Sequence, residues 1–157
     1  MPYIIDGNNL IGCSPDISLE DNNSRSEIIG IVKKFQKKKK SKIIVVFDGE
    51  PDTFSSEENP TEKIVVRYPP IGDSADDEIK RILDGYTYFR DVVLVTSDRE
   101  LKDVAKKKGA RVVNSIEFYY ELKRVYRATG RIESKQKRID TEVSEGEVDQ
   151  WMKIFDK

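Results

Sequence analysis

The chain has 157 residues, with 28 Lys and Arg against 29 Asp and Glu and no His, so its formal net charge is -1. The absence of His excludes Ser-His-Asp and Cys-His relays and imidazole-bound zinc, which leaves acid–base chemistry to carboxylates, Lys, Tyr or metal-bound water. The single Cys, Cys13, excludes an intrachain disulfide and a site built from several thiolates. This usage fits a reducing compartment, and we expect a cytoplasmic protein.

The length predicts one compact domain with a short appendage, because a globule of this size buries roughly 68 to 70% of its unfolded surface. The longest apolar runs, such as those from Ile43 to Phe47 and from Val92 to Val95, are short. A membrane span needs about 20 apolar residues. The chain also begins without the basic and apolar regions of a secretory signal, so we expect no membrane association.

Short runs of β-branched apolar residues alternate with segments of helical period along most of the chain. Strands are expected near 2–6, 43–48, 63–68, 91–96 and 111–114, and helices near 24–38, 75–88, 99–108 and 116–128. Such alternation is typical of a parallel sheet with helices on both faces, and the continuous apolar runs indicate buried strands. The sequence therefore predicts a three-layer αβα domain of the α/β class with a central, mainly parallel five-stranded sheet.

Two segments break this alternation. Residues 49–62 are rich in Pro, Ser, Glu and Asn, which favours an exposed loop. Residues 123–138 hold seven basic side chains against one Glu, whereas residues 139–157 hold six acidic side chains against two Lys. This change of sign predicts a domain over 1–128 and a distinct charged extension over 129–157, with a helix near 144–155.

Three of the predicted strands end in an aspartate, namely Asp6, Asp48 and Asp98. Another acidic pair, Asp76 and Asp77, opens the helix that follows the third strand. In open α/β sheets, ligands bind beyond the carboxyl ends of the strands, where the strand order reverses. If the first, second and fourth strands are neighbours, these carboxylates converge on one small region.

Converging carboxylates repel one another unless a cation lies among them. Mg2+ or Mn2+ is the natural partner, because hard cations prefer oxygen ligands. Two such ions ~3.5 to 4 Å apart can generate hydroxide and stabilise both oxygens of an in-line phosphoryl displacement. We expect Asp6, Asp76 and Asp98 to be direct or water-mediated metal ligands, with Asp48 second to them.

Each aspartate also has a structural interpretation. Asp98 suits the N-cap of the next helix, and Asp76 and Asp77 favourably face a helix dipole. Because adjacent helical residues point ~100° apart, at most one of that pair is expected to reach a metal.

Neither a P-loop nor a dinucleotide glycine pattern occurs, and Asp6 lacks the second Asp that haloacid-dehalogenase-like phosphatases place two positions later.

Four motifs with their order and spacing resemble the YacP-like branch of the NYN-domain ribonucleases, within the PIN-like nuclease superfamily. They are Ile5-Asp6-Gly7-Asn8-Asn9, Val45-Val46-Phe47-Asp48-Gly49, Asp73-Ser74-Ala75-Asp76-Asp77-Glu78-Ile79 and Val95-Thr96-Ser97-Asp98-Arg99, followed by Gly109-Ala110-Arg111 and Ser115. The resemblance covers roughly residues 1–128. Two positions depart from the family's pattern: Asn8 stands where Tyr is frequent, and Lys80 stands where an acidic residue is common.

The resemblance implies a metal-dependent endoribonuclease that uses Mg2+ or Mn2+ and leaves a 5'-phosphate and a 3'-hydroxyl. It also implies a role in mRNA turnover or RNA processing at the ribosome. The catalytic carboxylates that it implies are Asp6, Asp48, Asp76 and Asp98, with Asn9, Thr96 and Ser97 as supporting polar groups. Asp77, beside one of these carboxylates, is a further supporting candidate.

Basic residues near aromatic ones are the candidates for RNA contact. Phosphate contacts would come from the basic stretch at 123–138, and neighbouring tyrosines would offer stacking surfaces, although these tyrosines also suit the core. Arg25, near a helix start, suits a phosphate contact or an ion pair with a neighbouring acid. The expected RNA-binding residues are Arg25, Lys123, Arg124, Arg127 and Arg131.

Two other functions remain open at this point. A noncatalytic RNA- or ribosome-binding module would keep the same fold and use the basic residues alone. A metal-dependent phosphatase acting on small phosphate esters would use the carboxylates alone.

Overall fold

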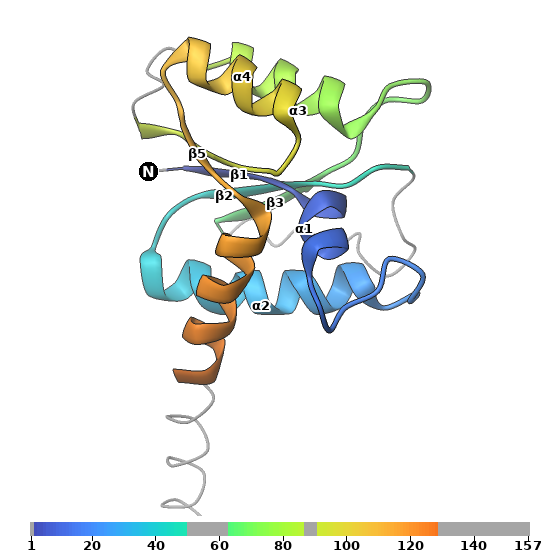
Figure 1. Ribbon diagram of the computed structural model, residues 1–157, viewed down its shortest axis with the longest axis vertical. Coiled ribbons are helices and arrows are strands. Elements are labelled where there is room, and N and C mark those ends of the chain that lie inside the picture. The colour runs from blue at the N-terminus through green and yellow to red at the C-terminus, as the bar shows by residue number, and fades with distance from the viewer. Residues whose placement is uncertain (1, 50–62, 87–90, 129–157) are drawn as a thin grey trace, which may run out of the picture.

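A sheet of five parallel strands runs through the middle of the protein, as the computed structural model in Figure 1 shows. The structure describes residues 2–49, 63–86 and 91–128. The strands are β1 (Tyr3–Asp6), β2 (Ile43–Val46), β3 (Ile64–Arg67), β4 (Val93–Val95) and β5 (Arg111–Val113). Their order is β3-β2-β1-β4-β5, so the prediction of a five-stranded parallel sheet is confirmed.

Helices cover both faces of the sheet (Figure 1). They are α1 (Gly7–Cys13), α2 (Ser24–Lys39), α3 (Ala75–Asp84), α4 (Arg99–Lys108) and a further helix over residues 115–128. Figure 1 shows α3 and α4 on one face, with α1, α2 and helix 115–128 on the other. The arrangement is the predicted αβα sandwich.

Strands β1, β2, β4 and β5 contribute alternate side chains to two separate cores. On β1, Ile5 packs into the core under α2 and helix 115–128, whereas Ile4 packs into the core under α3 and α4. On β2, Val45 and Val46 divide in the same way. Since successive side chains of a strand point to opposite faces, a strand buried on both faces must be apolar throughout.

The structure differs from the sequence-based expectation at two helices. Helix α1 was not predicted, because its sequence contains Asn8, Asn9 and Gly12, which are poor helix formers, and it is only seven residues long. Helix α3 was predicted to reach residue 88 but ends at Asp84, where Gly85 caps it. None of the helices in the described ranges is long and apolar enough to cross a membrane.

Several predictions fall outside the described residues. They concern positions 50–62 of the predicted loop, the extension at 129–157, the helix near 144–155, and Arg131.

Candidate functional site

Asp6 lies where β1 ends and α1 begins, and it is nearly buried, with 5% of its surface exposed. Its Oδ1 accepts a hydrogen bond from the backbone N–H of Asn9 at 3.5 Å, which caps α1. Its Oδ2 accepts a hydrogen bond from the Thr96 hydroxyl, beyond β4, at 3.1 Å. The carboxylate is therefore fixed between two neighbouring strands.

Burial raises the pKa of Asp6 to about 6, against the opposing hydrogen bonds from Thr96 and Asn9. The negative charges of Asp76 and Asp48 add to the rise. A buried carboxylate without a cationic partner is costly at neutral pH. This environment favours binding of a cation.

Asp98 lies at the end of the turn that follows β4 and caps α4. Its Oδ1 accepts a hydrogen bond from the Leu101 N–H at 3.0 Å, as the structural interpretation expected. Its own N–H donates to the Thr96 hydroxyl oxygen at 3.1 Å. Because the same hydroxyl donates to Asp6, one buried Thr96 side chain connects two of the aspartates.

Asp48, two residues beyond β2, connects that strand end to the start of α3. Its Oδ1 accepts a hydrogen bond from the Ala75 N–H at 2.7 Å, next to Asp76 in the sequence. Its N–H donates to the Asn8 side-chain oxygen at 3.0 Å, and its carbonyl accepts a hydrogen bond from Arg25 at 2.7 Å. Asp48 thus fixes where α3 presents its first turn.

Asp76, in that first turn, is electrostatically coupled to the other three aspartates. Burial raises its pKa, and the charges of Asp98 and Asp48 raise it further. Its own charge in turn raises the pKa of Asp6. Four carboxylates from the ends of β1, β2 and β4 and from α3 therefore share one electrostatic environment, because the strand order places β1 between β2 and β4.

Asp77 has a different environment from Asp76, although the two are adjacent. Its side chain accepts a hydrogen bond from the Ser74 N–H at 3.0 Å, and the Ser74 hydroxyl accepts one from the Asp77 N–H at 3.2 Å. This reciprocal capping box lowers the pKa of Asp77. Asp77 therefore stabilises the start of α3, which keeps Asp76 in position.

Lys80 places a positive charge beside the acidic cluster. It lies one turn after Asp76 on α3, and its ammonium donates to Glu100 of α4 at 2.7 Å. Its charge opposes the rise in the pKa of Asp76, so it offsets part of the repulsion among the carboxylates.

The Asn9 side chain connects three segments around the carboxylates. Its oxygen accepts hydrogen bonds from the Ser97 N–H at 2.8 Å and from the Ser115 hydroxyl at 2.6 Å. The Ser115 N–H donates to the Ser97 hydroxyl at 3.2 Å. Ser115 was not among the predicted site residues, although it follows β5 as the aspartates follow their strands, and this position could have identified it.

Asn9→Ala should lower the free energy of unfolding by about 1–3 kcal/mol, because it leaves the Ser97 N–H and the buried Ser115 hydroxyl without their acceptor. Urea unfolding measures the loss. Asn8→Ala is the matched control, since the Asp48 N–H that it frees is exposed to water. Equal losses in the two variants would contradict the structural role of the Asn9 side chain.

The donor set fits a hard divalent cation. Within residues 2–49, 63–86 and 91–128, no three acidic or sulfur side chains gather closely enough to form a ready-made metal site. Mg2+ needs no such cluster, because it usually binds through one or two carboxylates and completes its shell with water and phosphate oxygens. Coupled carboxylates with raised pKa values are suited to that mode of binding.

The predicted RNA-binding residues do not share one location. The Arg25 guanidinium lies 5.4 Å from the ring centroid of Phe47 and 5.5 Å from that of Tyr68, and it donates to the Asp48 carbonyl. It therefore supports the strand end that carries Asp48. The other described candidates lie on helix 115–128 and line a pocket there.

Comparison with known families gives a match over residues 3–156 to the model described as the YacP-like NYN domain. The chain belongs to the YacP-like NYN domain family. This membership confirms the resemblance drawn from the four motifs. At a coarse level it supports an RNase-type nuclease, and therefore a hydrolase with RNA as substrate.

Solved structures of a YacP protein share the fold. The crystal structure of Rae1 (YacP) from Bacillus subtilis superposes with a TM-score of 0.74 at 21% identity, covering 99% of this chain and 91% of that chain. A point mutant of the same protein gives a TM-score of 0.69 at 23% identity, covering 94% and 89%. A search of curated proteins found no match.

Proposed function

We propose that this YacP-like NYN domain is a metal-dependent endoribonuclease that hydrolyses RNA phosphodiester bonds with Mg2+ or Mn2+. The observation that carries the proposal is the coupling of Asp76 to Asp6, Asp48 and Asp98, which four separate segments bring to one edge of the sheet. The negative charges of these aspartates repel that of Asp76, which is costly for stability alone, and a divalent cation would relieve that cost.

Asp6, Asp76 and Asp98 are the residues that would hold the metal, which supplies an activated water and neutralises charge that develops on the phosphate. Asp48 acts through the backbone of Ala75, where its hydrogen bond fixes the first turn of α3. Thr96 and Asn9 orient Asp6 and the turn before Asp98. Thr96 and Asn9 thus keep carboxylates in place without themselves carrying charge.

The motif resemblance supports a more specific proposal. Hydrolysis would leave a 5'-phosphate and a 3'-hydroxyl, and the RNA substrates would be messenger or precursor RNAs processed in the cytoplasm, at the ribosome.

The test is cleavage of a structured RNA in Mg2+ or Mn2+, with and without a chelator. Asp76→Asn should reduce cleavage by at least about 100-fold, because loss of groups around a metal commonly costs 10- to 100-fold and Asp76 is proposed as a direct ligand. Asp84→Asn, at the other end of α3, is the matched control. It removes an exposed carboxylate paired with Lys108 and should cleave as the unchanged protein does.

Cleavage that persists in the chelator or in folded Asp76→Asn would contradict the metal mechanism. RNA binding without any cleavage would favour the noncatalytic binding module. Hydrolysis of small phosphate esters in place of RNA would favour the phosphatase.

A further inference from the structure

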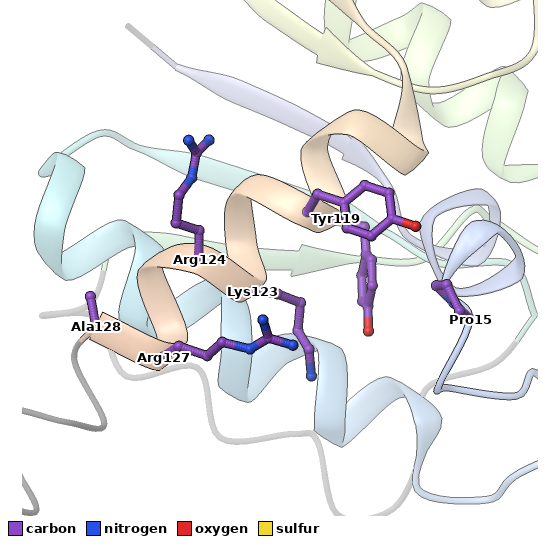
Figure 2. A pocket seen from close by; sticks show the side chains of 7 residues that line it. Pro15, Tyr119, Lys123, Arg124, Arg127 and Ala128 are labelled. Atoms are coloured by element: carbon purple, nitrogen blue, oxygen red, sulfur yellow. The ribbon is translucent and has the colours of Figure 1, made fainter.

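A pocket of about 730 Å³ lies between helix 115–128 and the segment that follows α1. Its lining consists of Pro15, Tyr119, Tyr120, Lys123, Arg124, Arg127 and Ala128. In the view of Figure 2, Tyr119 lies between Pro15 and the basic side chains of the helix. The pocket thus combines an aromatic part with a cationic part.

The aromatic part is formed by two tyrosines in an edge-on arrangement. The ring centroids of Tyr119 and Tyr120 lie 5.8 Å apart, with an angle of 62° between the planes. Tyr120 is 59% exposed, which is unusual for so large a side chain and leaves a ring face available for stacking.

The Tyr119 hydroxyl provides an independent indication of a ligand. Tyr119 is 3% exposed, and its hydroxyl is the buried side-chain polar atom without a hydrogen-bond partner among the described residues. An unpaired buried hydroxyl costs about 1–3 kcal/mol unless water or a ligand pairs with it. An occupant of the pocket that carries polar atoms would recover this cost.

Two of the three cationic side chains of the pocket form no ion pair among the residues that the structure describes. Arg124 and Arg127 are exposed, and neither forms an ion pair within the described parts of the chain. Lys123, by contrast, pairs with Asp16 at 3.0 Å, which neutralises the acidic residue next to Pro15 and holds that segment against the helix. The two arginines therefore remain available for an anion.

The pocket is structurally connected to the carboxylate cluster. Helix 115–128 begins at Ser115, whose hydroxyl donates to Asn9 in the network around Asp6. Tyr119 follows one helical turn later, and a turn rises ~5.4 Å along the axis. A chain bound along this helix would therefore pass from the pocket toward the carboxylates.

We propose that this pocket binds one nucleotide of a single-stranded RNA substrate, with its base stacked on Tyr120 and its flanking phosphates on Arg124 and Arg127. The inference rests on the proposed function for the identity of the ligand as RNA. Proteins that bind single-stranded nucleic acids combine cationic side chains with an aromatic stacking face, and this pocket offers both. An acidic peptide would use the arginines but would have no need of the exposed ring.

The test measures binding of a fluorescent ten-nucleotide oligouridylate by anisotropy, in EDTA so that no cleavage occurs. Tyr120→Ala should weaken binding about tenfold or more, because stacking of a base on an aromatic ring is typically worth a factor of that size. Tyr120→Phe keeps the ring and should bind within about twofold of the unchanged protein. Circular dichroism confirms that each variant is folded.

The charged contribution is tested by the double variant Arg124→Gln with Arg127→Gln. It should weaken binding and reduce the slope of log K against log salt by about 1.4, since each phosphate contact on a single strand contributes ~0.7. The matched control is Lys106→Gln with Lys107→Gln, which removes two exposed charges from the last turn of α4. It should leave both affinity and slope unchanged.

Undiminished affinity in Tyr120→Ala, or an equal loss in the arginine and lysine double variants, would overturn the pocket assignment. Equal affinity for duplex RNA would overturn the stacked base. Metal-dependent cleavage together with undiminished binding by Tyr120→Ala would support the proposed function and contradict only the assignment of the pocket as a nucleotide-binding site. Absence of cleavage together with the expected binding losses would support the nucleotide-binding pocket and contradict the proposed nuclease function.

Discussion

Asp6→Asn is expected to stabilise the metal-free protein at neutral pH while it abolishes RNA cleavage. Burial raises the pKa of Asp6 from 3.8 to about 6, so the native state binds this proton more tightly than the unfolded chain does. The contribution of Asp6 to stability therefore falls as pH rises from about 4 to about 6, and above that range its full penalty is present. A shift of this size corresponds to roughly 3 kcal/mol.

Asn at position 6 has no charge to desolvate, and it is a good N-cap, so it keeps the hydrogen bond to the Asn9 N–H. Urea unfolding in EDTA at pH 7.5 should show that the free energy of unfolding is about 1–3 kcal/mol higher than in the unchanged protein. The gain does not exceed the full penalty of the charged Asp6, because the new amide has less favourable hydrogen-bond partners than a protonated carboxyl. The gain should shrink at pH 4. A loss of stability at pH 7.5 would contradict the picture of a destabilising carboxylate.

The same pair of proteins tests metal binding without reference to activity. A cation that binds only the native state stabilises it by mass action. Mn2+ or Mg2+ should therefore raise the stability of the unchanged protein more than that of Asp6→Asn. Equal stabilisation of the two proteins would show that Asp6 does not contribute to metal binding.

The sequence was sufficient to predict the sheet because burial on both faces requires apolar side chains throughout a strand, and that requirement is local. It also singled out the aspartates as candidates, since residues that follow parallel strands share one edge of the sheet. Their convergence depended on the strand order, which the apolar runs at Ile43–Val46 and Val93–Val95 do not specify. The strand order became known only from the structure, in which β2 and β4 both pair with β1.

Other features of the site were not predicted from the sequence, and some of them depend on contacts between segments that are distant along the chain. The contribution of Arg25 to the Asp48 backbone was not predicted: its guanidinium lies over Phe47 and Tyr68 and donates to the Asp48 carbonyl, and its predicted contact with RNA stays a prediction. Asp76 and Asp77 are alike in sequence, and only the capping box with Ser74 distinguishes them. Helix α1 forms despite weak propensity because Asp6 caps it and Leu10 and Ile11 are buried against the sheet.

Gly7→Ala is expected to lower the free energy of unfolding by about 2–3 kcal/mol, at the upper end of the usual cost of overpacking. A Cβ at position 7 would lie 2.5 Å from two carbons of the Phe47 ring and 2.9 Å from the Val46 carbonyl oxygen. The ring is fully buried with Arg25 over it, and the carbonyl belongs to β2, so neither can move freely. Urea unfolding measures the loss.

Gly30→Ala is the matched control, with the opposite sign. Gly30 is exposed within α2, and nothing lies within 4 Å of a Cβ there. Alanine at this position should stabilise the protein by about 0.5–1 kcal/mol, because it favours the helix and restricts the unfolded chain. If the two variants changed stability in the same direction, the close approach at Gly7 would not be a constraint.

The partner of the clash can be identified with a double variant. Phe47→Leu removes the ring carbons that a Cβ at position 7 would meet but leaves the Val46 carbonyl in place. Gly7→Ala should therefore cost less in the Phe47→Leu background than alone, by about 1 kcal/mol, with part of the penalty remaining. Because Asp6 precedes Gly7 and Asp48 follows Phe47, the same clash would separate two of the carboxylates, so cleavage by Gly7→Ala should fall even under conditions where the variant is fully folded.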